Sequence, residues 1–265
     1  MRLPDNFSFS QHNLQDYVDC KYRFLQKYIR GIEWPAVESE PVVLQEIRME
    51  LGAQFHRLVQ QYFAGIDPSA LESTIQSDEL VEWWQAFCTL KLIELPGDKS
   101  AEKILTIPVA NNRLIAKYDL LINHGDGSYT IYDWKTSQHK PLPARMMDRL
   151  QSIVYPYVLQ SSLTSRNETA SVIEMIYWFP THPTEPIEFT YSSQQLENDR
   201  EYLMGLVNEI TTNDEDWFTK TSQTKFCAYC RYRSLCDREI QAGQLQDAEN
   251  LLDLDSVFDL DFDAL

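Results

Sequence analysis

Two acids and a lysine in the middle of the chain could act together on a phosphodiester. Residues 129–135 are expected to form a β-strand, and because side chains alternate between the faces of a strand, Asp133 and Lys135 project together. Residues 123–127 have the composition of a hairpin turn. If the turn centres on its middle residue, Asp119 lies opposite Asp133, with their Cβ atoms about 5 Å apart.

Two carboxylates this close repel each other unless positive charge lies between them. A divalent cation with Lys135 beside it would supply that charge. Mg or Mn bound by Asp and His side chains could activate water and stabilise charge on a phosphate. His56 lies at the edge of an apolar helical face, and Gly52 leaves room for an ion or a strand to approach it. The alternative is a surface cluster in which Lys135 pairs with a carboxylate.

Five cysteines offer a second kind of chemistry. Cys227 and Cys230 have the spacing of two ligands to one metal centre, Cys236 can supply a third, and Cys20 after a short helical segment can supply the fourth. Four thiolates could hold zinc or an iron–sulfur cluster, and one pair plus two single cysteines favours the cluster. The alternative is ordinary buried thiols, which the basic residues nearby disfavour. Cys88 lies in an apolar helical pattern and is expected only to pack.

Alternating helices and strands must position these residues. Helices are expected at about 43–63, 78–92, 147–158 and 194–210, and strands at 103–109, 113–122, 128–134, 172–179 and 187–191. Helices that flank a central sheet indicate an α/β or α+β domain.

The composition is that of a folded, acidic protein. The chain has 265 residues, of which 43% are hydrophobic, and its net charge of −17 argues against attraction of the whole surface to nucleic acid or anionic membrane. Residues 220–238 nevertheless carry five bases against one acid, whereas residues 247–265 carry seven acids and no base. The sequence has no run of 18 apolar residues and no signal-peptide pattern, so we expect a cytoplasmic protein without a membrane span.

The motifs and their order resemble the RecB-like branch of the PD-(D/E)XK nuclease superfamily. They are Leu51-Gly52-x-x-x-His56, then Asp119, then Asp133-Trp134-Lys135, and finally Gln151-x-x-x-Tyr155. One early cysteine and a late C-x2-C-x5-C resemble the iron–sulfur members, which include the CRISPR-adaptation exonucleases and the nuclease domain of AddB-type helicase-nucleases. The resemblance covers roughly residues 8–238.

The resemblance implies a restriction-endonuclease-like central mixed sheet flanked by helices. Its nuclease domain would span residues 1–240, with an iron–sulfur module at about 8–30 and 220–238 joining the N- and C-terminal segments. Residues 241–265 would form an acidic, disordered tail. Because the tail also carries Leu, Val and Phe, it could dock a protein partner or cover the basic 220–238 segment.

The resemblance also assigns roles to single residues. The catalytic metal would be held by His56, Asp119, Asp133 and the Trp134 carbonyl. Lys135 would orient or activate water, while Gln151 and Tyr155 would position DNA or the water. A 4Fe-4S cluster, or zinc in the alternative, would be held by Cys20, Cys227, Cys230 and Cys236. Pro156 directly after Tyr155 removes an N–H and is expected to kink the helix that carries both positioning residues.

The predicted function is that of a metal-dependent DNA nuclease, acting as an exonuclease on single strands or DNA ends in DNA processing, repair or CRISPR adaptation. Gly97-Asp98-Lys99-Ser100 lacks the glycines of a P-loop, so no ATP is expected. Two alternatives stay open. One is a non-catalytic DNA- or protein-interaction module that retains the fold and the cluster, and the other is a zinc-stabilised hydrolase of another phosphodiester.

Overall fold

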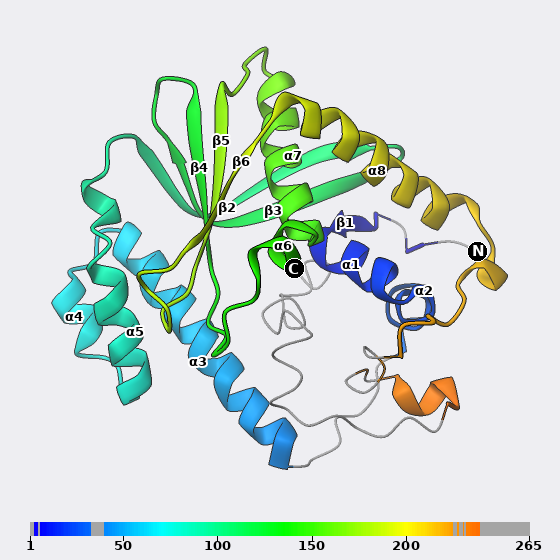
Figure 1. Ribbon diagram of the computed structural model, residues 1–265, viewed down its shortest axis with the longest axis horizontal. Helices are drawn as coiled ribbons and strands as arrows, with labels where there is room; N and C mark the ends of the chain where they lie inside the picture. The colour runs from blue at the N-terminus through cyan, green and yellow to red at the C-terminus, as the bar shows by residue number, and fades with distance from the viewer. Residues whose placement is uncertain are drawn as a thin grey trace.

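A mixed sheet of six strands lies at the centre of the fold (Figure 1). The computed structural model describes residues 3–4, 6–32, 40–224, 227, 230 and 232–238. The strand order is β1-β3-β4-β5-β6, and β2 pairs with β3 outside this path. The pairs β1/β3 and β4/β5 are parallel and the others antiparallel. The strands are β1 Ser8–Ser10, β2 Asp98–Val109, β3 Asn112–Asn123, β4 Ser128–Trp134, β5 Val172–Trp178 and β6 Ile187–Tyr191.

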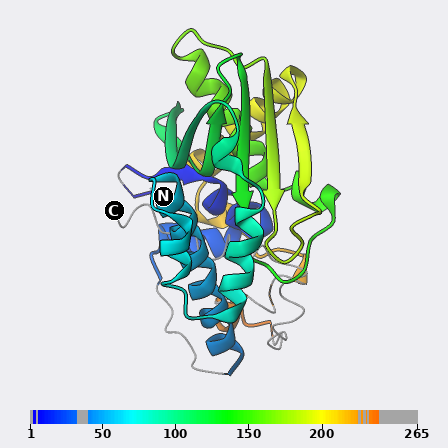
Figure 2. The same ribbon diagram turned by 90° about the vertical axis from the view of Figure 1, so that its left-hand side faces the viewer.

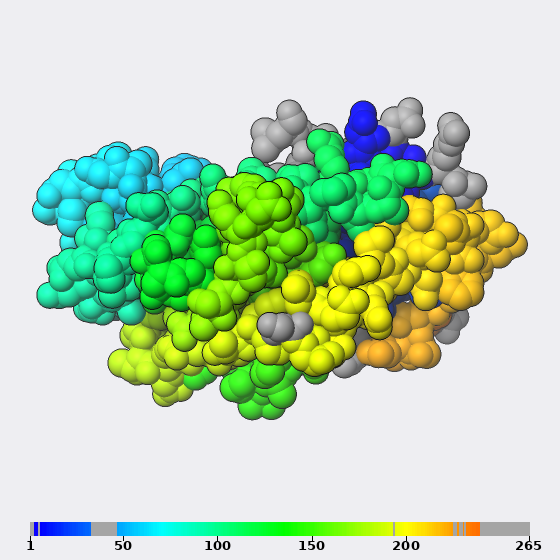
Figure 3. Space-filling view, turned by 90° about the horizontal axis from the view of Figure 1, so that it is seen from above, coloured from blue at the N-terminus to red at the C-terminus, as the bar shows by residue number. Residues whose placement is uncertain are grey.

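Helices flank this sheet, as predicted. In Figure 1, α7 crosses in front of the strands and α3, α4 and α5 are grouped together, and the side view of Figure 2 shows that group below the strands. Figure 3, seen from above, places gold α8 at the opposite end of the molecule from the cyan helices. The helices are α1 Gln11–Asp19, α2 Lys21–Phe24, η1 Leu25–Ile29, α3 Glu40–Phe63, α4 Pro68–Glu72, α5 Asp78–Cys88, η2 Leu92–Glu94, α6 Pro143–Met147, α7 Leu150–Thr164, α8 Ser193–Thr212, η3 Glu215–Trp217 and η5 Arg233–Cys236.

Two hydrophobic cores meet along β3. One core is formed with residues of α1, α7 and α8, and the other with residues of α3, α4 and α5. Tyr118 and Leu120 are two positions apart, which in a regular strand puts them on one face, yet Tyr118 belongs to the first core and Leu120 to the second. The regular alternation of faces is therefore interrupted at Asp119, and beyond it the strand contributes Leu121 to the first core and Ile122 to the second.

The β3/β4 hairpin has the predicted register. Leu120 pairs with Tyr132, and the same register extended by one residue places Asp119 opposite Asp133. On the other side of β3, the pairs that flank Glu102 join Ala101 to Leu120 and Lys103 to Tyr118, so Glu102 lies opposite Asp119. Three acids are therefore aligned across β2, β3 and β4.

The helix expected from residue 147 is wrong at its start. Met147 ends the short α6 with a half-exposed side chain, and α7 begins at Leu150 after Arg149 adopts an extended backbone. The helix expected at 78–92 ends at Cys88. Pro156 lies inside α7 without ending it, and the Tyr118 hydroxyl donates a hydrogen bond to the Tyr155 carbonyl at 2.9 Å.

Candidate active site and cysteine centre

Three potential metal ligands converge at Asp119 of β3. One ligand atom each of His56, Glu102 and Asp119 lies within 4.8 Å of the others. His56 comes from α3, Glu102 from β2 and Asp119 from β3, and His56 Nδ1 is 3.3 Å from Asp119 Oδ1. Imidazole and carboxylate oxygen are suitable ligands for Mn, and carboxylate oxygens for Mg. The group therefore has the composition of a divalent-cation site.

Sequence reasoning did not find Glu102. Its backbone has a φ of 54°, a left-handed conformation that costs a non-glycine residue about 1–3 kcal/mol and that is concentrated at functional sites. Lys117, two residues before Asp119, forms an ion pair with Glu102. Counting outward from the two-residue turn between β2 and β3 puts Glu102 opposite Asp119, and this count was the available signal.

Asp119 is held as a carboxylate. Burial by itself would raise the pKa of Asp119, but His56, the Trp134 N–H and Lys135 outweigh it, and the pKa lies below its usual value. The Trp134 N–H donates to Asp119 Oδ2 at 2.7 Å, which fixes this side chain against the end of β4. Asp119 is therefore ionised and oriented at neutral pH.

Asp133, Lys135 and Gln151 form a buried cluster. Lys135 Nζ is 3.0 Å from Asp133 Oδ2, and Gln151 Nε2 donates to Asp133 Oδ1 at 2.6 Å. The two charged side chains are only 4% and 6% exposed, so the ammonium neutralises a carboxylate that water barely reaches. The structure thus joins Asp133 to Lys135 and Gln151, and joins Asp119 to His56 and Glu102.

Gly52 allows α3 to approach the end of β4. A Cβ atom built on Gly52 would lie 2.8 Å from Thr136 Oγ1, directly after Lys135. The sequence predicted room here for an ion or a strand to approach His56, and the structure places Thr136, the second residue after β4, against Gly52. The gap is filled by Thr136 rather than left open.

Tyr155 lies one turn after Gln151 but has a different environment. Its ring packs against Tyr118 with 5.1 Å between centroids, and the side chain is buried. Gln151 reaches Asp133, so the two predicted positioning residues contact different groups.

Four of the five cysteines, the four proposed as ligands, line one pocket. Cys20 lies between α1 and α2 with an extended backbone, and it meets Cys227, Cys230 and Cys236 from the other end of the chain. Cys88 instead packs at the edge of the α3–α5 core. The described residues therefore place the predicted ligand set around a single centre.

The chemistry of this pocket suits a metal or cluster. Burial is the main cause that raises the pKa of Cys230 to about 11, with Arg23 opposing it and Cys20 and Cys236 adding to it. Burial likewise raises the pKa of Cys236. Four thiolates could not share such a pocket without a cationic centre to neutralise them, and a metal-bound thiol is deprotonated.

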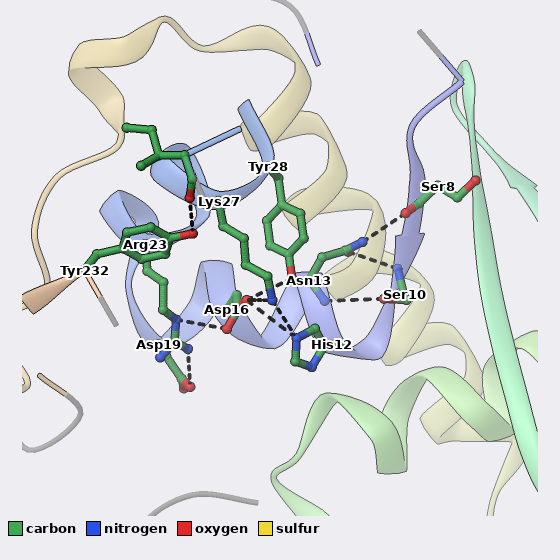
Figure 4. A network of polar contacts seen from close by, with 11 residues as sticks. Ser8, Ser10, His12, Asn13, Asp16, Asp19, Arg23, Lys27, Tyr28 and Tyr232 are labelled. Atoms are coloured by element: carbon green, nitrogen blue, oxygen red, sulfur yellow. Dashed lines mark hydrogen bonds and ion pairs between the residues drawn. The ribbon is translucent and has the colours of Figure 1, made fainter. Parts of the chain in front are cut away.

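A polar network supports the Cys20 side of this pocket (Figure 4). Arg23 lines the pocket, and its guanidinium contacts Asp16 and Asp19 at 2.9 Å each. Asp16 also accepts a hydrogen bond from the Tyr28 hydroxyl at 2.9 Å. From the C-terminal side, the Tyr232 hydroxyl donates to the Ile32 carbonyl at 2.9 Å. The Tyr232–Ile32 hydrogen bond thus joins the segment that follows Cys20 to the segment that carries Cys230 and Cys236.

The predicted basic surface is only partly described. Lys225, Arg231 and the whole of 241–265 lie outside the described residues. Lys220 Nζ donates to the Cys236 carbonyl at 2.5 Å, and an Arg238 nitrogen donates to the Thr221 carbonyl at 2.6 Å. These two cations therefore brace the cysteine segment internally.

The chain belongs to the PD-(D/E)XK nuclease superfamily, which it matches over residues 8–237. Among solved structures it is similar to the protein SSO0001, at 12% identity over 91% of this chain and 90% of that one, with a TM-score of 0.42. It is also similar to a protein of Eubacterium rectale named as a candidate exonuclease, at 11% identity over 77% and 81% of the two chains, with a TM-score of 0.47. No curated protein matches. Within the described residues, no helix is long and apolar enough to cross a membrane.

Proposed function

We propose that the protein is a metal-dependent DNA nuclease. The observation that carries this proposal is the convergence of His56, Glu102 and Asp119 beside a buried Asp133–Lys135 pair, in a chain of a nuclease superfamily. The acids and the histidine come from regular elements, because His56 lies on α3, Glu102 on β2, Asp119 on β3 and Asp133 on β4, so rigid elements hold them.

The proposed metal ligands are His56, Glu102 and Asp119, with Asp133 and the Trp134 carbonyl at the adjoining edge of β4. A Mg or Mn ion bound there would activate water and stabilise charge on the phosphate. Lys135 would orient the attacking water, and its ion pair with Asp133 keeps the ammonium in one place. Gln151 would fix Asp133, to which it donates a hydrogen bond. Tyr155, which is buried against Tyr118, would help to position the same helix and, through it, Gln151.

Exonuclease action on single strands or DNA ends, in DNA processing, repair or CRISPR adaptation, follows from the sequence resemblance to iron–sulfur nucleases. The same resemblance supports a 4Fe-4S cluster on Cys20, Cys227, Cys230 and Cys236, with zinc as the alternative. The shared pocket and its crowded, buried thiols are compatible with either centre. We also propose that the acidic tail, residues 241–265, binds a protein partner.

The test is a cleavage assay with Mg or Mn on linear and circular DNA, each single- and double-stranded. The purified wild-type protein should degrade linear substrates and need the added cation. Asp119→Asn keeps the shape of the side chain but removes its charge, and it should abolish cleavage. Equal activity of wild type and Asp119→Asn would show a contaminating nuclease. Absence of cleavage on every substrate would favour the non-catalytic interaction module.

A further inference from the structure

Tyr177 lies behind Lys135 on the neighbouring strand. It is fully buried, and it pairs with Asp133 in the parallel β4/β5 ladder. Lys135 Nζ lies 5.8 Å from the centroid of the Tyr177 ring, within the range of a cation–π contact. The backbone N–H of Lys135 also donates to the Trp178 carbonyl at 2.9 Å. Strand β5 therefore holds both the backbone and the ammonium of this lysine.

The Tyr177 hydroxyl is itself held by α7. Ser152 Oγ lies 2.5 Å from the Met146 carbonyl oxygen and 2.8 Å from the Tyr177 hydroxyl. A carbonyl only accepts, so the single hydroxyl hydrogen of Ser152 goes to Met146. Tyr177 must then donate to Ser152, and this directed chain fixes the orientation of its ring.

Gln151 and Ser152 are consecutive residues of α7, and each holds a group that contacts the buried ion pair or belongs to it. Gln151 donates to the Asp133 carboxylate, and Ser152 holds the Tyr177 ring that lies against Lys135. One turn of one helix thus supports both members of the buried ion pair.

We propose that Tyr177, held by Ser152, is a positioning residue for the Lys135 ammonium; this inference rests on the proposed nuclease function. A lysine side chain has many rotamers, and their entropy favours disorder of the ammonium. Asp133 fixes the ammonium on one side, and the ring closes the space on another. Precise placement of Lys135 relative to the phosphate should then raise kcat.

The kinetic test removes single groups. Tyr177→Phe keeps the ring and removes its hydroxyl. Ser152→Ala removes the side-chain oxygen to which that hydroxyl is hydrogen-bonded. Each should lower kcat about tenfold while KM and Mn affinity stay unchanged. The double variant should fall no further than either single variant, because both remove one hydrogen bond. Additive losses, or an unchanged kcat in Tyr177→Phe, would overturn the proposal.

Tyr191→Phe is the matched control. Tyr191 is buried on β6, where its hydroxyl lies near the Asp199 carboxylate, away from the described contacts of Lys135. The control likewise loses one buried phenol hydroxyl, and it should keep its kcat. Equal losses of kcat in the control and in Tyr177→Phe would indicate a general structural effect and refute positioning.

A spectroscopic readout does not depend on cleavage. In lysine-labelled protein, the Lys135 side-chain signal is assigned by its disappearance in Lys135→Arg. Its ring-current shift should be reduced in Tyr177→Phe and Ser152→Ala and lost in Tyr177→Leu. If the wild type cleaves no DNA but the shift behaves in this way, the nuclease proposal fails and the positioning stands. A shift unchanged by all three variants refutes the positioning, whatever the cleavage result.

Discussion

Glu102 lies opposite Asp119 in the β2/β3 ladder, with a left-handed backbone in the middle of a twelve-residue strand. The distortion brings a carboxylate to the place where His56 and Asp119 already meet. Asp133 on β4 contacts Lys135 and Gln151, whereas the ligand atoms that lie together with that of Asp119 are those of His56 and Glu102.

Replacing Glu102 tests whether it is a ligand. Glu102→Gln keeps the size of the side chain and removes its charge, so Mn affinity should fall at least about tenfold in calorimetric titration. Glu94→Gln is the control, because Glu94 is exposed on η2 and lies 4.0 Å from Lys91. Wild-type Mn affinity in Glu102→Gln would remove this residue from the metal site.

The hairpin that carries Asp119 and Asp133 was predictable because a glycine-containing turn between two apolar runs sets the register by counting. Glu102 was not found because its strand was expected to begin at residue 103, and a left-handed backbone at a glutamate has no signal in residue type. The start of α7 was missed for a similar reason. No proline or glycine marks the break at Asp148 and Arg149, and only the extended backbone of Arg149 separates the two helices.

The spacing of Cys227, Cys230 and Cys236 predicted three members of the cysteine set, and the position of Cys20 after a short helical segment suggested the fourth; all four line one pocket. The polar contacts that surround the cysteine pocket could not be predicted from the sequence. Tyr232 donates to the carbonyl of Ile32, 200 positions away, and Arg23 of α2 pairs with Asp16 of α1; no local pattern specifies such pairs. The contact between Ser152 and Tyr177 likewise could not be predicted from the sequence.

The effect of Gly52→Ala on the free energy of unfolding should have opposite signs in two backgrounds. Alanine is favoured over glycine inside a helix by about 1 kcal/mol, but its methyl group would meet Thr136 Oγ1. We expect Gly52→Ala to destabilise the wild type and to stabilise a Thr136→Ala background. Urea unfolding of the wild type, the two single variants and the double variant measures both effects. The same effect in both backgrounds would show that Thr136 does not restrict this turn.

The buried ion pair predicts that Lys135→Met affects stability as well as activity. Removal of the ammonium leaves Asp133 buried without its counter-charge, which should cost about 3–5 kcal/mol of unfolding free energy. Adding Asp133→Asn should restore most of that loss while cleavage stays absent. If the single and double variants unfold at the same urea concentration, the pair is not buried as described.

Asp16 predicts a contribution to stability that depends on pH. Burial would raise the pKa of Asp16, but Arg23, His12, Lys27 and Tyr28 lower it to about 2 from the usual 3.8. This depressed pKa contributes about 2 kcal/mol above pH 4, and the contribution is lost as the pH falls from about 4 toward 2. The stability difference between wild type and Asp16→Asn should therefore shrink over that interval. A difference that stays constant from pH 7 to pH 2 would contradict this account.

The cysteine pocket brings together distant parts of the chain, since Cys20 and Cys227 are 207 positions apart in the sequence. A metal centre that holds both removes a large loop-closure entropy from the unfolded state. Cys230→Ser should therefore lose iron and visible absorbance in anaerobically purified protein, and it should also lose stability. Cys88→Ser is the matched control, because Cys88 packs on α5 outside the pocket, and it should keep both properties. Zinc instead of iron in the wild type would select the alternative metal without moving the ligands, whereas equal metal loss in both variants would refute the ligand set.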